Sequence, residues 1–142
     1  MRALPVSMLI CLPLIAACTH LTEDTGGKSC KSVDGSYQMQ ADLFFGRDIA
    51  GRAPVTPAEQ ASFLADVVTP RFPEGLTMWE TYGQWRDPST GQVGKEDSFV
   101  VRIIAPETRI TLERLSEIRS AYKQQFHQQS VGLVFSRSCA SF

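Results

Sequence analysis

The sequence is poor in histidine and has no excess of basic charge. Its 142 residues include only two histidines, and its 14 Lys and Arg residues stand against 15 Asp and Glu residues, a net charge of −1. Binding to phosphates needs a basic stripe, and a metal site needs a cluster of ligands such as histidines or a CxxC pair. The composition therefore argues against a nucleic-acid partner, and it indicates no bound metal or other cofactor.

The familiar catalytic signatures are also missing. The sequence holds no GxSxG, no dinucleotide fingerprint and no HExxH. The segment from Gly46 to Gly51 has the glycine spacing of a phosphate loop, but the Lys-Ser/Thr that should follow is absent. His127 has no cysteine or carboxylate close to it in sequence. No catalytic residue is indicated, and these absences favour a protein that binds over one that catalyses.

No apolar run is long enough to cross a membrane. The run from Ala3 to Ile15 is broken by Pro5 and Pro13, and it is shorter than the roughly 20 residues that a transmembrane helix needs. It follows Arg2 and ends in small residues. Such a short apolar stretch between a basic start and small residues is typical of a secretory signal.

The end of this run, Ile15-Ala16-Ala17-Cys18, resembles the cleavage site of bacterial lipoproteins. The resemblance implies that residues 1–17 are a signal peptide and that the thiol of Cys18 carries lipid, with palmitate among its chains. Thr19 after the cysteine resembles the residue that directs such proteins to the outer membrane, facing the periplasm. The alternative is an ordinary Cys18 and cleavage at a nearby Ala-x-Ala-like site, which would give a soluble periplasmic protein.

Only two of the four cysteines remain once this signal is accounted for. Cys11 leaves with the signal peptide and Cys18 is lipidated, so Cys30 and Cys139 are left. In an oxidising compartment the simplest outcome is a disulfide between them. Two unpaired thiols, or a redox or metal pair, are the alternatives.

The chain that follows the signal is long enough for one domain. Residues 18–36 are polar and rich in Ser, Thr and Gly, which predicts a flexible tether behind the lipidated cysteine. Residues 37–142 then form a single α+β domain.

Apolar periodicity predicts four strands and two helices in this domain. Alternating or continuous apolar runs indicate strands, whereas apolar positions at a period of 3.6, with Thr56-Pro57 as a cap, indicate helices. The expected elements are a strand at 37–45, a helix from Thr56 to about Pro70, strands at 76–86 and 98–104, a helix from about Thr108 to Phe126, and a strand at 131–137.

This order is that of the ferredoxin-like split βαβ sandwich. Its antiparallel-type sheet has the strand order 4-1-3-2, and both helices cover one face. The first and last strands are neighbours, which brings Cys139 within reach of Cys30 and makes their disulfide feasible.

The face of the sheet without helices carries polar and aromatic residues together. Asp42 and Arg102 fall on adjacent central strands, and we expect them to form a structural ion pair, with a role in a sheet-face site as the alternative. A mixed face of this kind also suits a homodimer through the sheet, as in dimeric α+β barrels that enclose ligand pockets.

A second candidate site lies around the predicted hairpin of strands 76–86 and 98–104. This candidate binding patch consists of Arg71, Trp85, Arg86, Glu96 and Ser98. A guanidinium beside an indole can bind a carboxylate or a planar group by forked hydrogen bonds and stacking. The alternative is that the tryptophan covers the sheet edge while the arginines satisfy loop carbonyls or Glu96.

Four segments of the chain occur together in a known family: TPRFPEGLT at 69–77, GQWR at 83–86, Glu96-x-Ser98, and Tyr122-x3-Phe126-x2-Gln-Ser-Val up to 131. From about Tyr37 to Phe142 the chain resembles short bacterial secreted or lipid-anchored proteins that are classed as a domain of unknown function. The resemblance implies a class of protein without a mechanism.

We therefore expect a lipid-anchored protein of the cell envelope that binds an unknown protein or small-molecule ligand without catalysis. The alternative is a small enzyme or ligand carrier of the dimeric α+β barrel type.

Overall fold

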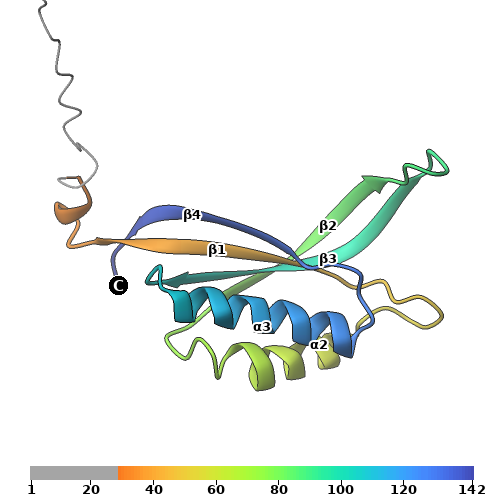
Figure 1. The fold of residues 1–142 in the computed structure, drawn as a ribbon, viewed down its shortest axis with the longest axis horizontal. Coiled ribbons are helices and arrows are strands. Elements are labelled where there is room, and N and C mark those ends of the chain that lie inside the picture. Colours follow the sequence, from red (N-terminus) through yellow and green to blue (C-terminus); the bar gives the residue numbers. More distant parts are fainter. Residues whose placement is uncertain (1–28) are drawn as a thin grey trace, which may run out of the picture.

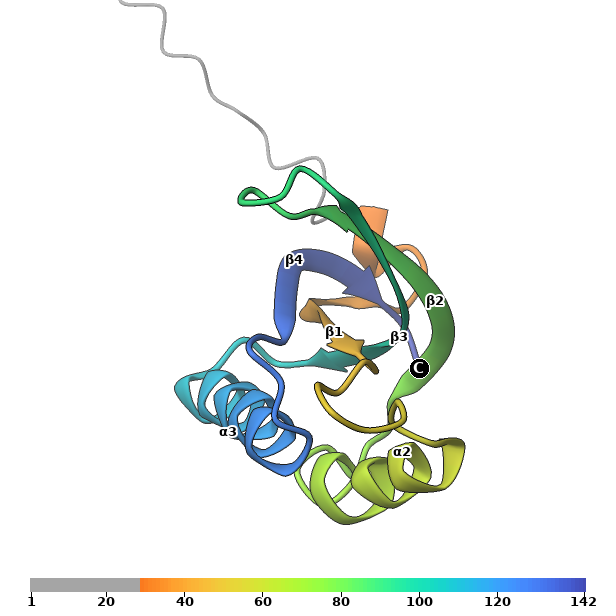
Figure 2. The same ribbon diagram turned by 90° about the vertical axis from the view of Figure 1, so that its right-hand side faces the viewer.

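A four-stranded antiparallel sheet with helices under one face makes up the computed structural model, which describes residues 29–142 (Figures 1 and 2). The expected signal peptide and Cys18 lie outside the described residues. The elements are β1 (Ser36–Gly46), α2 (Pro57–Phe63), the π-helical turn η1 (Leu64–Val68), β2 (Thr77–Arg86), β3 (Val93–Ala105), α3 (Arg109–Gln125) and β4 (Gly132–Ala140).

The sheet has the order β2-β3-β1-β4, and all three neighbouring pairs are antiparallel. This is the predicted order 4-1-3-2 read from the other edge, so the predicted ferredoxin-like α+β fold is confirmed. Asp42 of β1 lies opposite both Arg102 of β3 and Val134 of β4. The two central strands therefore carry the pair that the sequence placed on the open face.

The helix α2 begins where the sequence predicts, but it ends earlier than predicted. Thr56 caps it, because the Thr56 hydroxyl accepts from the Glu59 N–H while the Glu59 carboxylate accepts from the Thr56 N–H. After Phe63 the helix widens into the π-helical turn, which ends with the Thr69 N–H donating to the Leu64 carbonyl. The single helix expected from Thr56 to about Pro70 is therefore two consecutive segments.

The core lies between the helices and the inner face of the sheet, and aromatic rings form its centre. Phe45 stacks on Phe99 with ring centroids 4.8 Å apart, and Tyr122 of α3 meets Phe45 edge-on at 4.7 Å. Phe63 and Phe126 complete the cluster, and all five rings are buried. The Tyr122 hydroxyl donates to the Gly46 carbonyl at 2.8 Å, which satisfies its polar end.

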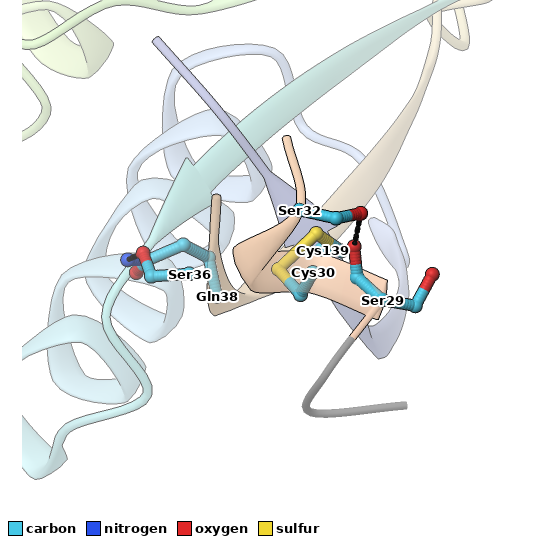
Figure 3. Close-up of a disulfide and its surroundings, with 6 residues drawn as sticks. All are labelled: Ser29, Cys30, Ser32, Ser36, Gln38 and Cys139. Atoms are coloured by element: carbon cyan, nitrogen blue, oxygen red, sulfur yellow. Dashed lines mark hydrogen bonds between the residues drawn. A yellow bond between two sulfur atoms is a disulfide. The ribbon is translucent and has the colours of Figure 1, made fainter. Parts of the chain in front are cut away.

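A disulfide joins Cys30 to Cys139 at the end of β4, with their Cα atoms 5.6 Å apart (Figure 3). The predicted disulfide is thus confirmed. Gly35 lies against the bond, and a Cβ there would come within 2.9 Å of the Cys139 Sγ. Residues 29–36, expected to be part of the tether, are instead folded onto the domain, because Cys30 is buried and covalently bound to β4. The rest of the expected tether lies outside the described residues.

Candidate functional site

A cavity of about 680 Å³ opens on the face of the sheet that carries no helices. It lies where β1 and β2 begin and where β3 and β4 end, so four strand ends contribute to its walls. Its volume falls in the range of small-molecule sites. Among its lining residues are Gln38, Leu76, Thr77, Arg102, Ile104 and Phe142.

Arg102 is the lining residue with the most defined geometry. Its Nε donates to Asp42 Oδ1 at 2.8 Å and its Nη2 to Asp42 Oδ2 at 2.7 Å, so the expected ion pair is present as a two-bond fork. The guanidinium carbon also lies 5.2 Å from the centre of the Trp79 ring. The hydrogen bonds that Arg102 donates to Asp42 raise the pKa of Arg102, and the contacts with Asp42 and Trp79 hold its guanidinium in place.

One nitrogen of this guanidinium is left over. Within residues 29–142, Nη1 of Arg102 has no protein hydrogen-bond partner, and the side chain is 39% exposed. Because Arg102 lines the cavity, its charge and its remaining donors are available to a bound molecule.

The other lining groups divide into polar and apolar. Gln38 donates through Nε2 to the Ser36 hydroxyl at 2.8 Å, whereas its Oε1 is buried without a partner among the described residues. Leu76, Ile104 and Phe142 supply apolar surface. A molecule with an apolar body and an acceptor group matches this combination of donors and apolar walls.

The structure does not bring the candidate binding patch together. Arg71, in the loop after η1, donates to Glu117 of α3 at 2.9 Å and to the Val67 carbonyl. Arg86, at the far end of β2, donates to the Gly91 carbonyl in the hairpin turn. Trp85 lies against Gly94, where a Cβ would come within 3.0 Å of the indole. The two arginines thus satisfy local partners at opposite ends of β2, and none of these side chains lines the cavity.

The remaining two members of the candidate binding patch, Glu96 and Ser98, form hydrogen bonds within the sheet and to the loop beside it. Glu96 accepts from the Asp48 N–H at 3.1 Å and covers Gly46. Ser98 and Thr81 share a hydrogen bond of 2.8 Å between their hydroxyls across β2 and β3. The first contact fixes β3 to the loop after β1, and the second joins the two strands of the hairpin.

A polar cluster that sequence reasoning missed joins β1, α2 and β2. Arg47 donates to the buried Gln60 and, at 3.2 Å, to Glu80, while Gln60 donates to the same Glu80 oxygen at 3.0 Å. The only available signal was an arginine directly after the first strand. These hydrogen bonds connect the loop after β1 with α2 and β2, although Nε of Arg47 is buried without a partner among the described residues.

Other groups with a shifted pKa lie at a helix cap, in a turn and in the core. Hydrogen bonds from Thr56 lower the pKa of Glu59, and hydrogen bonds from Ser89 lower that of Asp87 in the hairpin turn. Burial raises the pKa of Tyr122. Each shift has a structural cause, so none identifies a general acid or base.

Residues 29–142 contain no group of three His, Cys, Asp or Glu side chains that could hold a metal ion. None of the helices in this part of the chain has the length and apolarity to cross a membrane.

A family model described as a protein of unknown function, DUF3574, matches residues 40–142. The chain belongs to the DUF3574 family. The predicted membership in a family classed as a domain of unknown function is thereby confirmed. No curated protein matches the sequence of this DUF3574 member.

Solved structures show where else the DUF3574 fold occurs. The domain is similar to a phage SAM lyase in complex with S-methyl-5'-thioadenosine, with 17% identity and a TM-score of 0.54 over 74% of this chain and 90% of that one. It is equally similar to a phage SAM lyase in the apo state, with 17% identity and a TM-score of 0.54 over 76% and 89% of the two chains. At this identity the likeness concerns the fold alone.

Proposed function

We propose that this DUF3574 protein is a lipid-anchored protein of the cell envelope whose domain binds a small ligand beside Arg102 without transforming it. The observation that carries the proposal is the cavity at the end of the open sheet face, because it combines a suitable volume with an oriented guanidinium.

The Asp42–Arg102 pair prepares the cavity for a ligand. Asp42 holds two nitrogens of the guanidinium and Trp79 lies against its plane, so little side-chain freedom remains to be lost when a ligand binds. The third nitrogen can donate to a carboxylate, carbonyl or phosphate oxygen. Leu76 and Ile104 then bury the apolar part of the same molecule.

Support for the envelope location comes from the two ends of the chain. Residues 15–18 have the pattern of a lipoprotein cleavage site, and Thr19 favours the outer membrane. The Cys30–Cys139 disulfide is typical of proteins in oxidising compartments such as the periplasm. Incorporation of labelled palmitate in cells should disappear in Cys18→Ala, and unchanged labelling of that variant would contradict the anchor.

The ligand proposal is tested on the processed protein, purified from membranes in detergent. A small-molecule library is screened by thermal shift, and each ligand that stabilises the protein is tested again on Ile104→Trp, which fills part of the cavity. Val134→Trp is the matched control, because Val134 is exposed on the same face but does not line the cavity. A ligand bound beside Arg102 loses its effect in the first variant and keeps it in the second, whereas equal stabilisation of both variants would place it elsewhere.

The fold likeness to a phage SAM lyase favours a small enzyme as the second candidate. The library therefore includes S-adenosylmethionine and S-methyl-5'-thioadenosine, and mass spectrometry follows both after incubation. Product formation that stops in Arg102→Lys would favour the enzyme. Thermal stabilisation without product would favour the binding module.

A further inference from the structure

The strand β2 forms an open edge of the sheet. Within residues 29–142 it pairs only with β3, in an unbroken register from Thr77 to Arg86. Most of its side chains are exposed, including Tyr82 at 67% and Trp85 at 54%. The β2–β3 hairpin also extends beyond the helices, and β2 runs along the outer margin of the molecule (Figures 1 and 2).

This edge has little of the usual protection against pairing with another strand. Edge strands of natural sheets are commonly guarded by charged side chains, above all lysine, by proline, by a bulge or by short length. The strand β2 contains no lysine and no proline, its pairing with β3 shows no bulge, and it is ten residues long. Its free N–H and C=O groups can therefore accept a further strand.

The charges of β2 are arranged symmetrically about Gly83. Glu80 lies three residues before this glycine and Arg86 three residues after it, and they are the only charged residues of the strand. In an antiparallel pair of two β2 strands with a two-fold axis at Gly83, Glu80 of each copy comes opposite Arg86 of the other. Directly opposite residues share a face of the sheet, so both contacts are attractive.

We propose that two copies of this protein associate through their β2 edges, with Glu80 to Arg86 paired antiparallel about Gly83. The contact is isologous, as two-fold dimers require, and it joins the two sheets into one continuous sheet. Glu80 is accessible for it, since its side chain remains 55% exposed beside Arg47. The proposal is independent of ligand binding, because the cavity residues Leu76 and Thr77 lie outside the paired stretch.

Cysteine crosslinking at the axis tests the register. Gly83→Cys fits the fold, because a Cβ there would come no closer than 3.6 Å to the Glu96 carbonyl oxygen. Directly opposed antiparallel residues have Cα atoms about 4.5–5.5 Å apart, within the range of a disulfide. Mild oxidation of the processed full protein should give a covalent dimer on a non-reducing gel. Thr77→Cys, far from the axis on the same strand, should stay monomeric on the gel and serves as the control.

A charge exchange tests the pairing chemistry. Analytical ultracentrifugation should show that Glu80→Arg and Arg86→Glu each weaken dimerisation by about tenfold or more, because two like-charge contacts replace two attractive ones. An equimolar mixture of the two variants should regain dimers, since the two arginines of one variant then face the two glutamates of the other. Circular dichroism checks that each variant is folded, and if Glu80→Arg is unfolded beside Arg47, the crosslinking alone decides.

Two results would overturn the proposal. The first is a wild-type protein that stays monomeric at about 100 µM, far above the dissociation constant of a stable dimer. The second is a wild-type dimer that Gly83→Cys does not crosslink, which would favour association through the open sheet face instead.

Discussion

The two faces of the sheet differ in what they bury. The inner face is buried and aromatic, and the only hydroxyl in its ring cluster, on Tyr122, is satisfied by the Gly46 carbonyl. The outer face combines exposed Phe44 and Val134 with the Asp42–Arg102 pair and the cavity. The comparison indicates that the inner face supplies most of the stability while the outer face keeps groups available for binding.

The outer face is nevertheless not an ordinary solvated surface. Val100 lies on it and is only 1% exposed, because its neighbours opposite in register are the large side chains of Phe44 and Trp79. Trp79 thus covers Val100 and also lies against the Arg102 guanidinium. One aromatic ring therefore separates the apolar part of this face from the charged part.

The largest expected effect comes from removing an inner ring. Phe45→Ala should lower the free energy of unfolding by about 3–5 kcal/mol, because it leaves a cavity among packed aromatics. Phe44→Ala is the matched control on the outer face: it removes the same side chain from a position that is 44% exposed, and should cost only about 1–2 kcal/mol, because part of its apolar surface already faces solvent. Urea unfolding measures both, and similar losses would refute the contrast between the faces.

The disulfide closes the end of the sheet where the cavity lies. The double variant Cys30→Ser/Cys139→Ser should lose about 2–5 kcal/mol, since the bond closes a loop of 109 residues. Unfolding of the wild type with and without reductant is the control and should show the same difference. A variant as stable as the oxidised wild type would show that the bond contributes nothing.

Breaking the Asp42–Arg102 ion pair on the outer face should cause a smaller loss of stability. Asp42→Asn should cost about 1–3 kcal/mol, because a forked hydrogen bond to a charged group is lost while Arg102 stays partly exposed. Glu113→Gln removes a partner of Arg109 from an exposed helical pair and should change stability by about 0.5 kcal/mol or less. If the two variants lose the same stability in urea, the outer pair is no more than a surface contact.

The smallest effect on stability is expected from removing the hydroxyl of Tyr122 on the inner face, and this effect depends on pH. Tyr122→Phe should cost about 1 kcal/mol at neutral pH, because the Gly46 carbonyl loses its donor. Burial raises the pKa of Tyr122 above its ordinary value of 10, so the folded protein retains this proton longer than the unfolded chain does. The wild type should therefore lose stability as the pH rises above about 10. Thermal unfolding between pH 9 and 11 should show a shallower decline in the variant, and parallel declines would exclude Tyr122 as the cause.

Features that depend on periodicity and strand register could be predicted from the sequence. The order of strands and helices along the chain predicted the ferredoxin-like sheet. Its strand order placed Asp42 beside Arg102 and Cys30 near Cys139. The π-helical turn after Phe63 could not be predicted, because it ends the helix and no further helical turn follows in which its wider period would shift the apolar positions.

The candidate sites were harder to predict because closeness in sequence is not closeness in space. A strand of ten residues spans roughly 30 Å, so β2 separates Arg71 before its start from Arg86 at its end. The cavity shows the opposite case: Gln38, Leu76, Ile104 and Phe142 are distant in sequence, and only the meeting of four strand ends brings them together. No motif marks such a site.

The disulfide also determines how the domain would carry a mechanical load. A pull on the chain before Ser29 reaches the Cys30–Cys139 bond before it reaches any hydrogen bond of β1, and the bond passes the force to β4. The neighbouring strands β1 and β4 therefore resist together, whereas the β2–β3 hairpin lies outside this covalent path. Tension on the amino-terminal segment would thus reach β1 and β4 together and would not pass through the free edge of β2.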